Sequence, residues 1–298
     1  MSKLYIIGNG FDLFHGYKTS YDDFFRYLLN NNYDNTLSTL NKYWCGTGKN
    51  GGFWSDFEEN LGSLLDYESL MMDATEYSTD ITDENPKYNG VEIEVEHIFR
   101  PVVDLKKVII NFIKDATNNP PNSPINIDIN AKFINFNYSK TLEVIYQINT
   151  DNIFYIHGDI DDKEVILGHR ADNPFESYRA TDEDSYDFSV EIGVDRANGC
   201  FDEISKNSEQ IILDNTAYFE NLKEIKEVVV LGHSLSNVDK AYFEKIHQCV
   251  DGCTWCVSYH GCSNEISEKE AFLLNIGIST ENINFFSNEI KKDVDISY

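Results

Sequence analysis

Basic residues and long apolar runs are both scarce in this chain of 298 residues. It holds 24 Lys and Arg against 51 Asp and Glu, which gives a formal net charge of −27. Because nucleic-acid binding depends on neutralising phosphates with basic side chains, this balance disfavours nucleic acid as a partner. No apolar run approaches the roughly 20 residues that span a bilayer. We therefore expect neither nucleic acid nor a membrane among its partners.

Cysteine is also sparse, with six in the whole chain, and the first residues lead into an apolar segment without a charged-then-apolar leader. Structural disulfides are typical of secreted proteins. We therefore expect a cytoplasmic protein without disulfides. The cysteines and histidines between residues 247 and 262 do not have the spacing of paired Cys-x-x-Cys hooks, so no metal site is predicted.

Short apolar segments alternate with amphipathic ones along most of the chain. The segments that read as strands are Leu4–Ile7, Lys132–Asn137, Ile153–His157, Val228–Leu231, Thr254–Tyr259 and Ile283–Phe286. Continuous apolar strands separated by helices predict an α/β protein whose mainly parallel sheet is flanked by helices on both faces, as in Rossmann-like folds.

The sequence pattern predicts a single α/β domain across residues 1–298. Within it, residues 34–128 read as a mainly helical insertion after the first strand–helix unit, because Ile98, Val102, Leu105 and Ile109 recur at helical spacing. The segment Asn30–Gly52 is polar and rich in Asn and Gly, which predicts mostly loop.

Polar clusters follow four of the predicted strands, namely Gly8–His15, Asn135–Ser139, His157–Asp159 and Gly232–Asp239. In a parallel sheet the carboxyl ends of neighbouring strands meet at one edge, and ligands bind there. We therefore predict that these four clusters form one site.

Two of the clusters are candidates for holding a small nucleotide. Glycines in Gly8-Asn9-Gly10-Phe11 allow a ligand to approach the backbone, and the following helix supplies N–H groups for a phosphate. The stretch Gly232–Asp239 reads as a second turn that opens a helix, and its backbone at Gly232, His233 and Ser234 could hold a ribose or phosphate. Leu13 occupies the third glycine position of the dinucleotide fingerprint, so a tight turn without a ligand stays open as the alternative.

The other two clusters contain the candidate catalytic residues. An asparagine at a strand end, Asn137, can hydrogen-bond a ribose hydroxyl or orient a water, although a helix cap is the alternative. His157 follows a strongly apolar strand and can act as a base near neutral pH, unless it is structural.

The opening segment Gly8-Asn9-Gly10-Phe11-Asp12-Leu13, with His15-Gly16 after it, resembles the start of the AbiH family of bacterial abortive-infection proteins. Trp54, Phe57-Glu58, Asn137-Tyr138, His157-Gly158 and Gly232-His233-Ser234 recur in the order found in that family. This resemblance implies defence against phage, with a phage-derived trigger or partner protein. Whether the chain forms a homo-oligomer stays open.

The same clusters are similar, more distantly, to sirtuin-like domains, including NAD-degrading effectors of phage defence. Asn135 and Ser139 replace the threonine and aspartate of the sirtuin-like strand end, and Asp12 replaces a serine. The resemblance implies a sirtuin-like fold that cleaves NAD or a related nucleotide at the N-glycosidic bond, with NAD as substrate and no cofactor required. Asn137 would orient ribose or water, His157 would be the base, and Asp12 would favour the developing positive charge.

Two other functions stay open from the sequence. One is a nucleotide-binding sensor or partner-binding module without turnover. The other is a metal-dependent phosphoesterase or nuclease that uses Asp12, His15 and Asp239.

Overall fold

The computed structural model describes residues 2–44, 52–54, 56–79, 90–119, 125–181, 186–250, 252–261 and 263–287. The chain divides into two compact units. Unit 1 comprises Met1–Ser20, Ile110–Val165 and Asn207–Tyr298, and unit 2 comprises Tyr21–Ile109 and Ile166–Lys206. A single domain across residues 1–298, with residues 34–128 as an insertion, stays a prediction. Within the described ranges, none of the helices has the length and apolar character needed to cross a bilayer.

Unit 1 contains the sheet, and its strands are parallel as the sequence predicts. In the described residues its six strands lie in the order β3-β2-β1-β4-β5-β6. Their bounds are β1 Lys3–Ile7, β2 Lys132–Asn135, β3 Ile153–Tyr155, β4 Glu227–Leu231, β5 Thr254–Tyr259 and β6 Ile283–Ser287. This is the strand order of doubly wound dinucleotide-binding folds, in which the connections change direction between β1 and β4.

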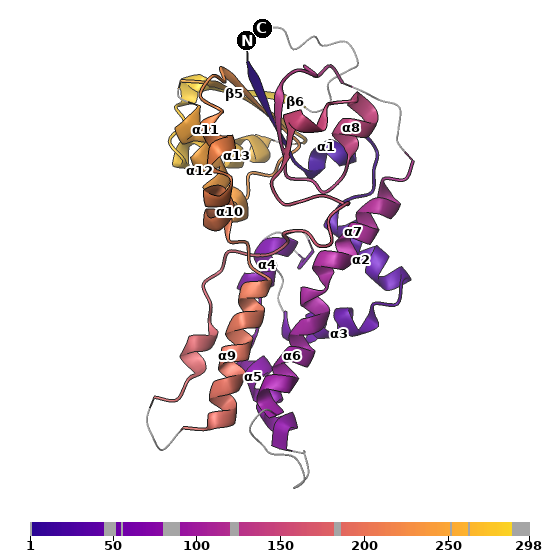
Figure 1. The fold of residues 1–298 in the computed structure, drawn as a ribbon, viewed down its shortest axis with the longest axis vertical. Coiled ribbons are helices and arrows are strands. Elements are labelled where there is room, and N and C mark those ends of the chain that lie inside the picture. The colour runs from indigo at the N-terminus through magenta and orange to yellow at the C-terminus, as the bar shows by residue number, and fades with distance from the viewer. Residues whose placement is uncertain are drawn as a thin grey trace. The chain divides into compact units, whose positions relative to one another are not determined.

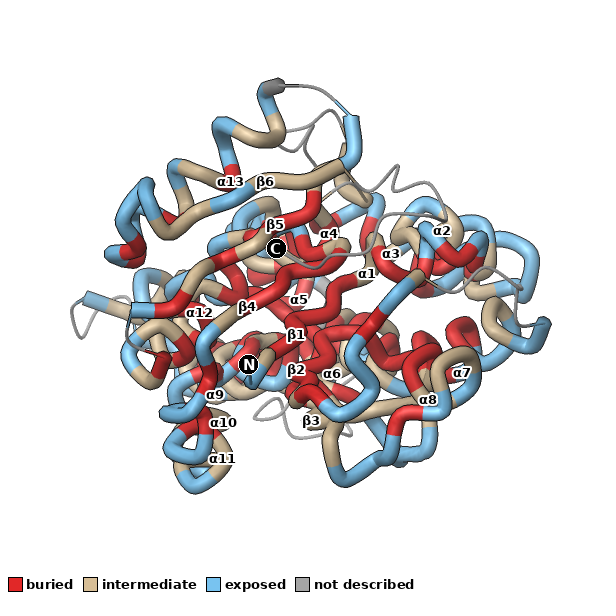
Figure 2. The backbone as a smooth tube through the Cα atoms, turned by 90° about the horizontal axis from the view of Figure 1, so that it is seen from above, coloured by how far each residue is buried: buried red, intermediate tan, exposed pale blue. Residues whose placement is uncertain are grey.

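Alternation along each strand sends successive side chains to opposite faces of the sheet, and both faces are buried. Leu4 and Ile6 of β1 belong to a first core, whereas Tyr5 and Ile7 belong to a second. Figure 2 shows the buried backbone of β1 and its neighbours in red. Burial of both faces requires apolar residues at nearly every position of these strands, which is why the strands could be recognised in the sequence.

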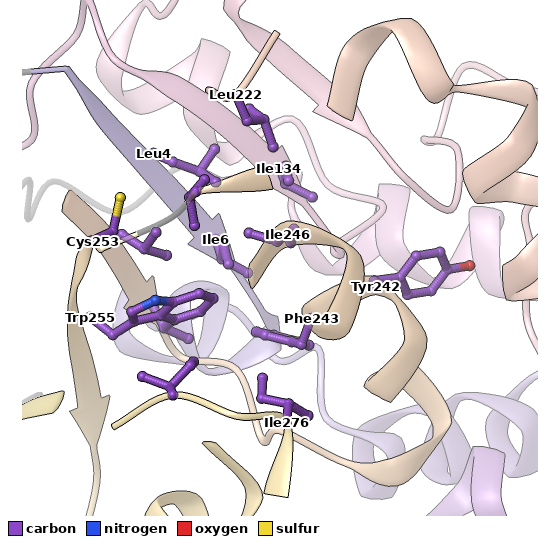
Figure 3. Close-up of a cluster of buried hydrophobic side chains, with 14 of the residues drawn as sticks. Leu4, Ile6, Ile134, Leu222, Tyr242, Phe243, Ile246, Cys253, Trp255 and Ile276 are labelled. Carbon is purple, nitrogen blue, oxygen red and sulfur yellow. The ribbon is translucent and has the colours of Figure 1, made fainter. Parts of the chain in front are cut away.

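The first core is covered by α10 (Ser208–Asp214), α11 (Thr216–Glu220), α12 (Lys240–Cys249) and α13 (Ser263–Asn275). Figure 3 shows its centre, where Trp255 of β5 lies among Ile6, Phe243 and Ile276. The second core is covered by α1 (Asn9–Phe14) and α8 (Thr141–Tyr146), which contribute Phe11 and Leu142. Helices on both faces complete the α/β architecture expected from the sequence.

Unit 2 is helical in its described part. It contains α2 (Tyr21–Asn30), α3 (Asp34–Tyr43), α4 (Phe57–Ser63), α5 (Tyr67–Thr79), α6 (Gly90–Val103), α9 (Phe188–Glu203) and the start of α7 (Leu105–Ala116). The helices α5, α6 and α9 lie side by side (Figure 1). The prediction of loop across Asn30–Gly52 is wrong at α3, because Leu37, Leu40 and Tyr43 bury one face of a helix there.

A buried ion pair joins the two chain segments of unit 2. Lys206 Nζ lies 2.8 Å from Glu58 Oε2 on α4, and the Lys206 side chain is only 1% exposed. The Lys206 backbone N–H donates to His169 O at 2.7 Å. Gly62, one helical turn after Glu58, packs on the His169 ring, where an added Cβ would lie 2.6 Å from Cγ. Glu58 therefore helps to hold α4 against residues 166–206.

Glu58→Gln should strongly destabilise the protein. The variant removes the negative charge that faces a buried ammonium, and breaking such a pair costs about 3 kcal/mol or more. Urea unfolding at neutral pH measures the loss. Glu68→Gln, on an exposed residue of α5, is the matched control and should change the midpoint little. Equal midpoints for the two variants would contradict the importance of the pair.

Candidate functional site

The four polar clusters lie at the carboxyl edge of the sheet in unit 1. Ile7, the last residue of β1, is paired in register with Asn135 of β2 and Leu231 of β4. Asn135 is in turn paired with Tyr155 of β3. These four strands end at one level, so the polar residues that follow them lie at the same edge of the sheet, as the sequence predicts for parallel strands.

The turns after β1 and β4 pack directly against each other, backbone to backbone. Gly8 N–H donates to Leu231 O at 2.9 Å, and Gly10 N–H donates to Gly232 O at 2.8 Å. A Cβ added to Gly10 would lie 2.8 Å from Gly232 Cα, and one added to Gly8 would lie 2.5 Å from His233 Cα. Gly232 also has a φ of +66°, which favours glycine. The glycines are needed for this contact whether or not a ligand binds.

Three N–H groups of the first turn, those of Gly8, Gly10 and Phe11, donate hydrogen bonds within the protein. Besides Gly8 and Gly10, Phe11 N–H donates to Gly8 O at 2.9 Å. The Asn9 side chain donates to Thr19 O at 2.9 Å and accepts from Thr19 Oγ1 at 2.7 Å. A phosphate bound by these N–H groups would have to displace their present acceptors. Nucleotide binding by Gly8, Asn9, Gly10 and Phe11 stays a prediction.

Asp12 is the centre of a first polar group. Its carboxylate is 1% exposed and accepts hydrogen bonds from Ser139 Oγ and Thr141 Oγ1, each at 2.6 Å. Burial raises the pKa of Asp12 to about 6, against the hydrogen bonds from Ser139, Thr141 and Asn137, which lower it. The carboxylate thus connects α1, after β1, to the segment that follows β2.

Asn137 belongs to the same group. Its Nδ2 donates to Gly8 O at 3.1 Å, and its backbone N–H donates to Asn135 Oδ1 at 3.1 Å. The N-cap of α8 is Lys140 and not Asn137, so the capping alternative does not apply. Asn137 instead attaches the end of β2 to the turn after β1.

His157 lies in a second polar group, with His233 and Asp239. Asp239 Oδ1 lies 3.7 Å from His157 Nε2, and Asp239 Oδ2 lies 3.6 Å from His233 Nε2. All three side chains are less than 10% exposed. The Phe136 ring packs edge-on against both imidazoles, with centroids at 5.3 Å and 4.5 Å. One carboxylate therefore faces the two histidines that follow β3 and β4.

The backbone after β4 fixes the tautomer of His233. Leu235 N–H donates to His233 Nδ1 at 3.0 Å, and Leu235 is held at a φ of +60°. A neutral His233 therefore carries its proton on Nε2, the nitrogen that faces Asp239. Ser234, between them, is exposed on the rim of the edge.

The two groups flank the strand ends toward opposite faces of the sheet. Phe136 and Tyr242, which contact His157, belong to the first core. Phe11 and Leu142, the sequence neighbours of Asp12 and Thr141, belong to the second core. The structure thus places Asp12 and Asn137 in one group and His157 in the other.

His15 belongs to neither group. Its Nδ1 donates to Phe11 O and its Nε2 accepts from the Tyr146 hydroxyl, both at 2.7 Å. Burial lowers the pKa of His15. Asp12, His15 and Asp239 thus lie in three separate sets of contacts. In the part of the chain that the structure describes, no group of three or more His, Cys, Asp or Glu side chains is placed to hold a metal ion.

Sequence reasoning missed Ser139 and Thr141 as partners of Asp12, and it gave Asp239 a catalytic role only in the metal hypothesis. The available signal was the pair of hydroxyl residues, Ser139 and Thr141, between the end of β2 at Asn135 and the first turn of α8. A hydroxyl at such a position can reach a carboxylate on the neighbouring turn, but nothing in the sequence names that carboxylate.

Comparison with known proteins gives one match. The model of the family described as bacteriophage abortive infection AbiH matches residues 4–259, which include both polar groups. No curated protein and no solved structure matches significantly. The similarity to sirtuin-like domains stays a prediction.

Gly10→Ala should destabilise the protein, because its Cβ would overlap the backbone of Gly232. Overpacking of this kind costs about 1–3 kcal/mol. Gly199→Ala is the control: no side chain crowds this position of α9, and replacing a mid-helix glycine stabilises by about 0.5–1 kcal/mol. Thermal unfolding should therefore shift in opposite directions for the two variants. A Gly10→Ala protein as stable as the wild type would contradict the tight contact between the turns.

The stability of the protein should depend on pH through Asp12. Its pKa rises from 3.8 to about 6 on folding, so ionising the buried carboxyl costs about 3 kcal/mol. Below both values the group is protonated in both states and costs nothing. Between them the unfolded chain loses its proton first, so the free energy of unfolding falls as pH rises.

Asp12→Asn should remove this fall, measured as the difference from wild type in urea unfolding between about pH 4.5 and pH 7. Asp73→Asn is the matched control with the opposite sign, because a hydrogen bond from Lys42 lowers the pKa of Asp73. The Asp73 carboxylate stabilises the protein at pH values above its pKa in the unfolded chain. This stabilisation is lost as the pH falls through its lower pKa in the folded protein. If the free energy of unfolding changed with pH in the same way in the wild type and in Asp12→Asn, the pKa of Asp12 would not be raised by folding.

Proposed function

Because the chain belongs to the bacteriophage abortive infection AbiH family, we propose that it acts in phage defence by cleaving NAD or a related nucleotide at the N-glycosidic bond. The observation that carries this proposal is the pairing of two buried polar groups at the carboxyl edge, where the strand order 3-2-1-4-5-6 changes direction. Dinucleotides bind across that point in doubly wound sheets.

The chemistry asked of the two groups is modest. Nicotinamide on the ribose is cationic, so it leaves as a neutral molecule when the glycosidic bond breaks and its electron pair returns to nitrogen. A water then forms the new bond to the sugar carbon and gives up a proton. His157, facing the Asp239 carboxylate, is the group suited to accept this proton. Asn137 is suited to orient the ribose or the water.

The negative charge of Asp239 supports this role of His157. A carboxylate beside an imidazole stabilises the imidazolium that forms when the base takes a proton. The contact of 3.7 Å is longer than a hydrogen bond. Such contacts often shorten when substrate binds, so the distance is compatible with the role.

The second candidate is a nucleotide-binding sensor or partner-binding module without turnover. Burial of the candidate groups favours it, because His157 is 2% exposed and Asn137 is 7% exposed. A ligand would first meet the more accessible rim, which includes Gly158, Gly232 and Ser234. In the catalytic proposal, a phage-derived trigger or partner would open this rim.

Purified protein should release nicotinamide from NAD, measured by chromatography with and without lysate from phage-infected cells. His157→Gln and Asn137→Ala should each lower the rate at least about 100-fold, the scale of losing a general base. The matched controls are His97→Gln, on an exposed histidine of α6, and Asn119→Ala, on an exposed bend. Both should retain the wild-type rate.

Two outcomes would contradict catalysis. One is an unchanged NAD pool in cells where the protein has been triggered by phage. The other is an intact nucleotide that co-purifies with the protein and binds equally well to His157→Gln, which would favour the sensor. Mass spectrometry of the nucleotide retained by the purified protein distinguishes the two functions.

A further inference from the structure

We infer that His233 is a positioning residue, a histidine held neutral that anchors the Asp239 carboxylate so that its negative charge acts on His157. The inference rests on the proposed function, in which His157 accepts the proton of the attacking water. It gives His233 a partner within the protein, whereas the sequence analysis expected His233 to hold a ribose or phosphate. The two roles of His233 predict different kinetics.

Two histidines face one carboxylate in the second polar group. Asp239, the last residue of the 3-10 turn Asn237–Asp239, lies 3.7 Å from His157 Nε2 through Oδ1 and 3.6 Å from His233 Nε2 through Oδ2. The two distances are nearly equal, so they do not decide which imidazole gains a proton. One carboxylate has one negative charge and can balance one imidazolium. The second ring nitrogen of His233 makes the difference.

This second nitrogen of His233 already accepts a hydrogen bond. The Leu235 N–H donates to His233 Nδ1 at 3.0 Å. An imidazolium has protons on both nitrogens and accepts from no donor. Protonating His233 would place one N–H against another, and the N–H of the buried Leu235 would lose its acceptor. His233 is therefore held neutral with its proton on Nε2, and the charge of the carboxylate is left to His157.

The surrounding structure keeps the His233 ring in this place. Leu235 has a φ of +60° although it is not a glycine, and its side chain belongs to the first core. Such a conformation persists only where the surrounding structure determines it, and it is concentrated at functional sites. Phe136 and Phe243 pack edge-on against the imidazole, with centroids at 4.5 Å and 4.9 Å. A Cβ added to Gly8 would lie 2.8 Å from His233 Cβ.

An anchored carboxylate acts directly on the proposed base. The Nε2–H of His233 faces Oδ2, so Asp239 presents Oδ1 to His157. Because His233 is neutral, it adds no positive charge that would cancel the charge of Asp239. A second titratable side chain, Tyr242 of α12, contacts His157 with ring centroids 5.4 Å apart. The charge of Asp239 thus stabilises the imidazolium that forms when His157 takes a proton from water.

The protonation of the two histidines can be measured directly. In full-length protein made with nitrogen-labelled histidine, the imidazole nitrogen shifts distinguish each neutral tautomer from the imidazolium. The seven histidines give few signals, and two are assigned by their absence from His157→Gln and His233→Gln. Between about pH 5 and pH 8, His233 should keep the neutral Nε2–H form, while His157 gains a proton as the pH falls. Either histidine behaving otherwise would overturn the inference.

His233→Leu tests whether His233 acts through Asp239. The variant removes the donor that anchors the carboxylate, so the protonation of His157 should move to lower pH by about one unit. In an Asp239→Asn background the charge is already absent, and adding His233→Leu should move it no further. An equal shift in both backgrounds would overturn the inference. His97→Leu, at a side chain of α6 that is 68% exposed, is the matched control and should cause no shift.

The kinetics of nicotinamide release separate positioning from contact with a ligand. His233→Leu should lower kcat at least about tenfold and leave the KM for NAD nearly unchanged, because the base is impaired while substrate binding is not. His233→Gln keeps an N–H donor near the position of Nε2, so its kcat should fall less. A raised KM with an unchanged kcat would show that His233 holds the ligand and would overturn the positioning role. His97→Leu should match the wild type in both constants.

The two proposals can fail separately. Wild-type protein that never releases nicotinamide, with or without lysate from phage-infected cells, would overturn the proposed function, while the nitrogen shifts would still test the anchoring of Asp239. His233→Leu protein as active as the wild type would overturn the positioning role and leave the proposed function standing. Should His233→Leu not fold, the wild-type nitrogen shifts and the kinetics of His233→Gln decide the role of His233.

Discussion

The contact between the Gly8–Gly10 turn and Gly232 is the constraint on which the site depends. Two backbones approach so closely there that a single Cβ on Gly10 would lie 2.8 Å from Gly232 Cα. This contact makes β1 and β4 end at one level. It also sets where α1 begins, and hence where Asp12 lies, and it places His233 at the end of β4. Both polar groups take their positions from it.

Much of the fold could be predicted because the sheet is buried on both faces, so that each strand is a nearly continuous run of apolar residues. The strand Thr254–Tyr259 coincides with β5, and the other predicted strands differ from the observed ones only at their ends. The α3 helix was missed because its polar Asn and Thr residues resemble a loop, although Leu37, Leu40 and Tyr43 recur at helical spacing.

The sequence indicated which residues lie at the site, but it gave much less information on which of their side chains contact one another. Polar residues after apolar strands indicated which segments meet at the edge. The sequence could not show that Phe136 would contact the histidines while Asn137, the next residue, would bind Gly8. Nor could it show whether Gly10 makes room for a ligand or for the backbone of Gly232, because either close approach requires a glycine at this position. The contacts of Asn137 with Gly8 and of Gly10 with Gly232 join residues more than a hundred positions apart.

The strand order also has a consequence for how the chain assembles during synthesis. β1 is made first, yet its neighbours β2 and β4 begin only at residues 132 and 227. Until those segments leave the ribosome, the apolar residues of β1 have no strand beside them. Such long-range pairings make folding slow. In a newly made chain, β1 is therefore covered only after β2 and β4 have been synthesised. While β1 is exposed, aggregation and chaperone binding compete with folding.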